Sequence, residues 1–136
     1  MKKFLLILTL FFLTGSVLRA QGDNDTNDKI RDKMTEFIQR RLNLSKNEAE
    51  KFSPVFLRYF HEWRSTLQQF KGNPDRLLLQ QKIVDLRLRY RNEFKDIVGE
   101  KRSNQIFEEQ QRFIDGVRKM REGQRLEGRP NRRFRS

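Results

Sequence analysis

The sequence predicts an all-α fold of four antiparallel helices joined by short connections. Three observations support this fold class. From residue 28 to residue 120, apolar residues recur at spacings of three and four, the period of a helix with one buried face. Turn signals at "NLS", "KGNPD" and Gly99 divide that stretch into four segments. No segment of strand length alternates between apolar and polar residues, so no sheet is expected.

Residues 1–20, "MKKFLLILTLFFLTGSVLRA", have the pattern of a secretory signal peptide. Lys2 and Lys3 precede an apolar run from Phe4 to Leu13, and small and polar residues follow up to Ala20. The apolar run is too short to span a bilayer comfortably. We therefore expect cleavage after Ala20 and export to the periplasm.

Charge and cysteine content narrow the possible functions. The chain has 30 Lys and Arg against 18 Asp and Glu; removal of the leader leaves 27 against 18, a net charge of +9. In an exported, single-domain protein this charge favours anionic lipid, envelope polysaccharide or acidic proteins as partners over nucleic acid. The absence of Cys excludes disulfides, thiolate metal sites and thiol nucleophiles.

The first helix is expected from Asp28 to Leu42. One stripe of apolar residues predicts it: Ile30, Met34, Phe37, Ile38 and Leu42. The preceding residues 21–28, "QGDNDTND", contain no apolar side chain. We expect them to form a disordered lead-in whose last Asn or Asp caps the helix.

A capping box predicts the start of the second helix. Ser45 is placed to accept a hydrogen bond from a backbone N–H of the first turn, and Glu48 to reach back to the cap. Leu44, before the cap, stands where a hydrophobic staple would begin.

The second helix carries a seam of mostly aromatic residues: Phe52, Phe56, Tyr59, Trp63, Leu67 and Phe70, widened by Val55 and Phe60. Pro54 lies beyond the first turn, where it removes the backbone bond to residue 50, so we expect a bend there. "KGNPD", residues 71–75, predicts the turn to the next helix.

The third helix is expected from Asp75 to Val98, with a seam of the same spacing: Leu79, Ile83, Leu86, Tyr90, Phe94 and Ile97. Three further apolar residues lie off that seam: Leu77, Val84 and Leu88. Two apolar sides imply two packing partners.

The fourth helix follows Gly99 and is expected to run to about Met120, although Gly116 weakens it. Residues 122–136 contain several Arg, Gly and a Pro without sustained periodicity, and we expect a disordered basic tail. The folded domain is therefore placed at residues 29–121.

Catalytic and metal-dependent functions have little support in the sequence. His61 is the single histidine and has no neighbouring nucleophile, so we interpret it as a surface or packing residue. No glycine-rich phosphate loop is present. We expect no catalytic residue, no metal site and no cofactor.

The residues around the second helix resemble the first repeat motif of the Spy/CpxP family of small exported helical proteins. That motif reads Leu-Thr-x-x-Gln, and Leu44, Ser45 and Glu48 occupy its positions with the capping chemistry preserved. A second, degraded copy has Val98 at the Leu position, Gly99 at the Thr position and Arg102 at the Gln position.

The resemblance implies a cradle-like helical homodimer, with a kinked long hairpin, that acts as an ATP-independent periplasmic chaperone in envelope stress. The alternative is a stress-responsive adaptor that binds the periplasmic part of one signalling protein. A third interpretation is a membrane-surface or polyanion binder that acts through the basic tail.

Under the chaperone interpretation, we expect contact with unfolded or flexible protein segments through five residues: Val55, Phe60, Arg87, Arg89 and Arg91. Long cationic side chains beside apolar ones attract flexible acidic or amphipathic chains without requiring one sequence. The remaining aromatic residues of the second helix are interpreted as mostly structural.

Overall fold

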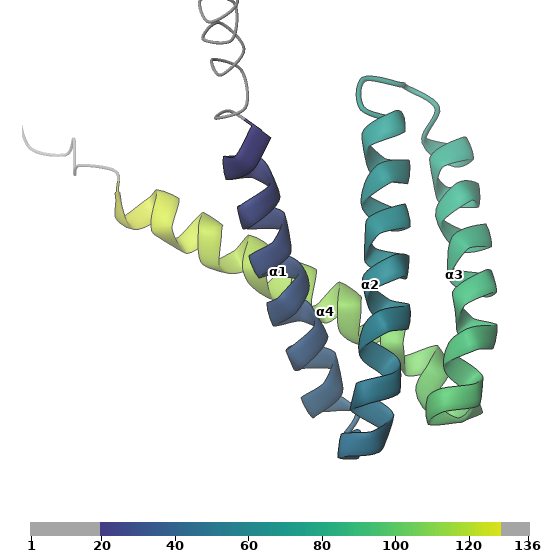
Figure 1. Ribbon diagram of the computed structural model, residues 1–136. Helices are drawn as coiled ribbons and strands as arrows, with labels where there is room; N and C mark the ends of the chain where they lie inside the picture. The colour runs from purple at the N-terminus through teal and green to yellow at the C-terminus, as the bar shows by residue number, and fades with distance from the viewer. Residues whose placement is uncertain (1–19, 129–136) are drawn as a thin grey trace, which may run out of the picture. The chain divides into compact units, whose positions relative to one another are not determined.

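A computed structural model describes residues 20–128, with side chains from residue 25 onward. It contains four helices packed antiparallel, and no strand in the described residues, so the predicted fold class is confirmed at this level (Figure 1). The helices are α1 (Ala20–Arg41), α2 (Lys46–Gln69), α3 (Arg76–Val98) and α4 (Glu100–Glu127). Within the described residues, none of these helices is long and apolar enough to cross a bilayer.

The chain divides into two compact units within α1. The first ends at Lys33 and the second begins at Met34. In the first unit, α1 begins at Ala20, so the expected disordered lead-in at residues 21–28 is wrong for the residues described. An ion pair supports this segment, because Arg31 Nη1 donates to Asp28 Oδ1 at 2.9 Å one turn earlier. The predicted leader before Ala20 lies outside the described residues.

The second unit begins with the last two turns of α1, which pack on α2 and α4. Met34 and Ile38 are fully buried, and the rings of Phe37 and Phe113 lie 5.6 Å apart. After Arg41 the backbone turns at Asn43, whose φ of 49° lies in the left-handed region that Asn tolerates.

The predicted capping box starts α2. The Ser45 hydroxyl accepts a hydrogen bond from the Glu48 backbone N–H at 3.1 Å, and the Ser45 N–H donates to Glu48 Oε1 at 3.0 Å. Leu44 is half-buried before the cap. α2 continues without interruption past the exposed Pro54, and the Ser53 hydroxyl donates to the Ala49 carbonyl at 2.9 Å beside it. The bend expected at Pro54 stays a prediction.

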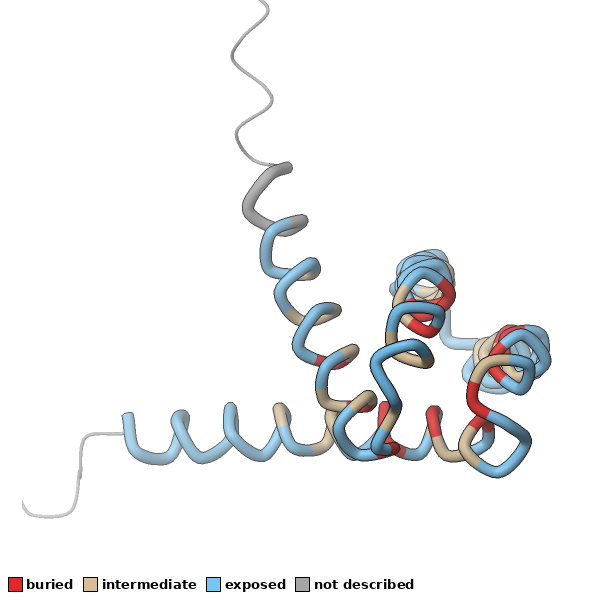
Figure 2. The backbone as a smooth tube through the Cα atoms, turned by 60° about the horizontal axis from the view of Figure 1, so that its bottom comes forward, coloured by how far each residue is buried: buried red, intermediate tan, exposed pale blue. Residues whose placement is uncertain are grey.

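α2 and α3 form an antiparallel hairpin. The loop between them ends at Asp75, whose carboxylate caps α3 by accepting from the Leu78 N–H at 3.0 Å. α3 ends at Val98, as predicted, and Gly99 at φ 86° allows the sharp turn into α4. α4 crosses the hairpin obliquely, near the end opposite the connecting loop (Figures 1 and 2).

α4 continues to Glu127, so residues 122–127 are helical and not part of a disordered tail as predicted. No proline lies between Gly99 and Pro130, and Arg125 in the last turn interacts favourably with the negative end of the helix dipole. Every residue from Arg118 to Gly128 is exposed, so this extension packs on no other described element.

Candidate functional site

The hairpin has two halves that differ in burial. We call residues 52–60 of α2 and 86–98 of α3 the covered half, and residues 61–70 of α2 and 76–85 of α3 the open half. Each half contains apolar residues of both seams. Nine residues of the covered half are buried: Phe52, Val55, Phe56, Tyr59, Phe60, Leu86, Tyr90, Phe94 and Val98. No residue of the open half is buried.

α4 accounts for the burial of the covered half. Phe107 of α4 lies with its ring 5.4 Å from Tyr59 and 6.1 Å from Phe94, and Ile106 is fully buried beside it. Tyr59 also donates its hydroxyl proton to Gln110 Oε1 of α4 at 2.6 Å. In Figure 2 the buried residues gather where α4 crosses the hairpin.

In the open half, the seams of α2 and α3 face each other without a third helix across them. Five inward apolar residues are only half-buried: Trp63, Leu67, Phe70, Leu79 and Ile83. A two-helix layer cannot remove both sides of a seam from water, so apolar surface stays accessible there. This surface, not the aromatic core, is therefore available to a partner.

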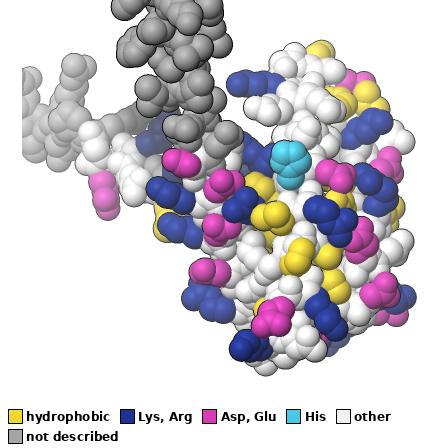
Figure 3. Space-filling view, in the orientation of Figure 1, with side chains coloured by type: hydrophobic (Ala, Val, Ile, Leu, Met, Phe, Trp, Pro, Cys, Tyr) yellow, Lys and Arg dark blue, Asp and Glu magenta, His cyan; other side chains and the backbone are white. Residues whose placement is uncertain are grey.

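Cationic side chains surround the accessible apolar surface. Arg64 and Lys71 lie on the α2 side of the open half and its loop, and Arg76 lies on the α3 side. Figure 3 shows apolar patches along the hairpin, with Lys and Arg as well as Asp and Glu side chains around them. Apolar and cationic groups together favour acidic or amphipathic chains.

The two apolar residues predicted to contact a partner are placed inside the domain. Val55 is 9% exposed and Phe60 is 5% exposed, and the Phe60 ring packs against Trp63 with centroids 5.6 Å apart. The prediction that they form an accessible contact surface is wrong for this chain alone. Both widen the α2 seam, and both side chains are buried in the folded chain.

The three predicted arginines do not form one patch. Arg87 is half-buried, lies 5.7 Å from the Phe107 ring, and donates from Nε to the Tyr59 oxygen at 3.5 Å. Arg89 extends on another side of α3 and pairs with Glu62 at 3.0 Å. Arg91 is half-buried, one turn beyond Arg87. Arg87 and Arg89 therefore have structural contacts.

Glu62 joins α2 to α3 at the boundary between the halves. It accepts from Tyr90 Oη at 2.6 Å and from Arg89 at 3.0 Å. The Tyr90 hydrogen bond, helped by Arg89, holds the pKa of Glu62 below its ordinary value. Burial, with the Glu62 hydrogen bond, raises the pKa of Tyr90 to about 12. A second exposed pair, Arg58 with Glu93 at 2.7 Å, spans the same two helices.

The outward side of α3 carries an exposed apolar stripe that was not among the predicted contact residues. Leu77 is 79% exposed, Val84 51% and Leu88 44%. These residues lie off the α3 seam, and the two apolar sides of this helix were the signal in the sequence that could have identified them. We call this set the outer stripe.

The two motif segments meet at the covered end of the hairpin. Arg102 Nη1 donates to Glu48 Oε1 at 3.1 Å and Nη2 to Oε2, while Arg102 Nε donates to the Val98 carbonyl at 2.9 Å. Arg102 thus holds the start of α2 against the start of α4. Its hydrogen bonds are the main cause that lowers the pKa of Glu48.

The described residues contain no group of three or more His, Asp or Glu placed to hold a metal ion. His61 is exposed on the hairpin surface, visible in cyan in Figure 3. Glu109 of α4 is buried and forms ion pairs with Arg41 at 3.0 Å and with Arg112 at 2.6 Å, so we interpret its role as structural.

Comparison with protein-family models, with curated proteins and with solved structures finds no match for this chain.

Proposed function

We propose that this protein is an exported, ATP-independent chaperone-like protein that binds unfolded or flexible protein segments during envelope stress. The observation that carries the proposal is the open half of the hairpin, where inward apolar residues stay half-buried and cationic groups surround them. This surface replaces the five residues expected from the sequence as the site of contact.

In this proposal the protein binds flexible chains with low affinity and little sequence specificity. A flexible chain gains roughly 25 cal/mol for each Å² of apolar surface it buries against Trp63, Leu67 or Phe70. Much of that gain is offset by the ordering of the chain. Surrounding cations speed the encounter with acidic segments and add little directional specificity. Such a surface suits many clients at modest affinity.

The proposed assembly is a homodimer with a cradle-like concave surface, as in the family that the capping motifs resemble. In this proposal the outer stripe of α3 forms part of the dimer interface, because a second copy would cover Leu77, Val84 and Leu88. A chain of this size buries a modest core alone, so association offers further apolar burial. The proposed compartment is the periplasm.

The test is light scattering from a chemically unfolded, aggregating client with the purified mature chain and no nucleotide. Suppression near a one-to-one ratio is expected. Leu67→Gln with Leu79→Gln should weaken it, because both side chains face into the open half. The matched control is Leu126→Gln with Met120→Gln, two exposed apolar residues on the α4 extension. Circular dichroism checks that each variant folds.

Three outcomes would contradict the proposal. No suppression for several unrelated clients, together with one protein captured reproducibly from an envelope extract, would support the regulatory adaptor. Loss of activity in the α4 control alone would move the site away from the hairpin. Loss only on deletion of residues 121–136 would support the polyanion or membrane-surface binder.

A further inference from the structure

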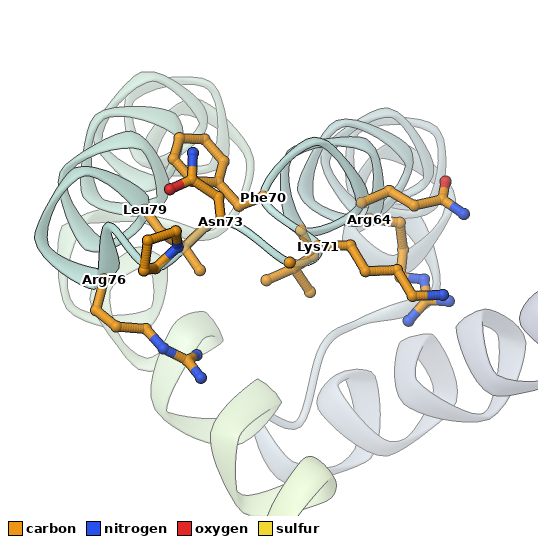
Figure 4. A pocket seen from close by; sticks show the side chains of 10 residues that line it. Arg64, Phe70, Lys71, Asn73, Arg76 and Leu79 are labelled. Carbon is orange, nitrogen blue, oxygen red and sulfur yellow. The ribbon is translucent and has the colours of Figure 1, made fainter.

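A cavity of about 580 Å³ lies at the loop end of the hairpin (Figure 4). The last turns of α2, the connecting loop and the start of α3 line it. Its volume falls in the range of pockets that hold small organic ligands, about 300–1,000 Å³. It lies in the part of the open half that is farthest from the point where α4 crosses the hairpin.

The charged groups of the cavity lining all have one sign. They are Arg64 and Lys71, which extend from the α2 side of the opening, and Arg76, which extends from the α3 side (Figure 4). No carboxylate lines the cavity. Asp75 lies between two lining residues in the sequence, but its carboxylate accepts from the Leu78 N–H and caps α3. The opening is therefore electropositive, and an anionic group is the favoured occupant.

The remaining lining provides apolar surface. Leu67 and Phe70 come from α2, Pro74 from the loop and Leu79 from α3. Leu67, Phe70 and Leu79 are half-buried, so an apolar group in the cavity would complete a burial that the two helices leave unfinished. A cationic opening above apolar walls suits a ligand with both kinds of group.

We propose that this cavity binds an anionic amphiphile with a single, medium-length alkyl chain. Its head group would interact with Arg64, Lys71 and Arg76, and its chain would lie against Leu67, Phe70 and Leu79. The cavity volume is in the range that holds a single ligand of drug size, which fits one alkyl chain with its head group. This binding does not require chaperone activity, although both use the open half.

The experiment is calorimetric titration of the full mature chain at low salt with four probes, each below its critical micelle concentration. Decanoate and decyl phosphate each have an anionic head group and an alkyl chain, and comparing them distinguishes a carboxylate from a phosphate head group. Decanol lacks the charge, and inorganic phosphate lacks the alkyl chain. We expect saturable binding of one equivalent for at least one anionic amphiphile and about tenfold weaker binding of the other two probes. The Gly72 amide signal should shift in NMR spectra, because Gly72 lies in the cavity lining.

Two variants and a matched control locate the site. Arg76→Glu and Lys71→Glu should each weaken binding about tenfold, because each replaces an attractive group with a repulsive one. Lys82→Glu makes the same charge change on the exposed surface of α3, outside the cavity lining, and should leave affinity within about twofold.

Equal losses in all three variants, or binding of decanol as tight as that of decanoate, would overturn the proposal. So would no saturable binding of either anionic amphiphile. These results would leave the aggregation assay unaffected, so failure of the cavity proposal and failure of the chaperone proposal are distinguishable.

Discussion

The covered and open halves of the hairpin have the same sequence pattern but lie in different environments. Both α2 and α3 place apolar residues at steps of four, three, four, four and three along their seams. In the covered half, Phe56, Tyr59 and Phe94 are fully buried, whereas in the open half Leu67, Phe70 and Leu79 remain half-buried. α4 crosses only one half. Periodicity therefore indicates which side of a helix turns inward, and the crossing position of a third helix decides whether that side is removed from water.

The largest effect on the free energy of unfolding is expected when an aromatic ring is removed from the covered half, compared with the same change in the open half. Phe56→Ala should lower the free energy of unfolding by about 3–5 kcal/mol, because a fully buried aromatic ring leaves a cavity. Phe70→Ala, on the same helix in the open half, should cost about 1 kcal/mol, because its side chain is only half-buried. Urea unfolding followed by circular dichroism measures both. Equal losses would show that the open half is as well packed as the covered half.

From the Glu62–Tyr90 contact at the boundary of the halves, we expect the protein to lose stability at alkaline pH. The folded-state pKa of Tyr90, about 12, lies above its ordinary value of 10.0. Its contribution is therefore present below pH 10 and lost as the pH rises through 12. Burial also raises the pKa of Tyr59, the other tyrosine.

Ultraviolet titration of tyrosinate at alkaline pH measures these pKa values. Glu62→Gln should lower the pKa of Tyr90 only in part, because burial is the largest cause of its shift and Glu62 the next. Glu108→Gln, a substitution on the exposed surface of α4, is the control and should leave both tyrosines unchanged. An unchanged titration in Glu62→Gln would contradict the contact.

The Glu48–Arg102 contact predicts stability lost in acid at the covered end. The folded-state pKa of Glu48 is held below 4.5, so its contribution is present above that pH and is lost as the pH falls through the folded-state value. Glu48→Gln should therefore destabilise the protein at pH 7 and have a smaller effect near pH 3. Urea midpoints at the two pH values test this, with Glu50→Gln, exposed on the same helix, as the control. An effect of equal size at both pH values would contradict it.

The smallest expected effect lies outside both halves, on α4. Gly116 is exposed within a continuous helix, and an added Cβ would meet no atom within 4 Å. Gly116→Ala should raise the free energy of unfolding by about 0.5–1 kcal/mol through backbone entropy. Thermal unfolding measures the gain. A loss of stability would indicate that α4 packs there against something, such as a second copy of the chain.

Local signals in the sequence predicted most of the helical framework. Ser45 and Glu48 located the start of α2, Asp75 the start of α3, and Gly99 the turn into α4, because capping and turn chemistry acts over a few residues. The start of α1 and the end of α4 were predicted less well. Residues 21–28 and 122–127 lack a periodic apolar stripe, yet are helical. In the second segment, the good helix formers Glu, Gln, Arg and Leu favour the helix. The first segment consists mostly of poor helix formers, and the Asp28–Arg31 ion pair is a local contact that supports it.

The candidate site was predicted less well, for a tertiary reason. Val55 and Phe60 lie on the widened seam of α2, and the sequence alone could not show that they are buried in the folded chain. Arg87 and Arg89 are two positions apart in the sequence, yet extend on different sides of α3 and contact different partners. The second apolar side of α3 was visible in the sequence, and its exposure became clear only from the fold.

The sequence by itself determined the all-α class, the caps, the two seams, the net positive charge and the lack of cysteine, because each depends on composition or on neighbours within about one helical turn. The tertiary structure decided which seam residues are buried, which arginines meet aromatic rings, and where apolar and cationic side chains line one cavity. Those features depend on contacts between residues far apart in the chain. The position at which α4 crosses the hairpin sets them, and no local pattern encodes that position.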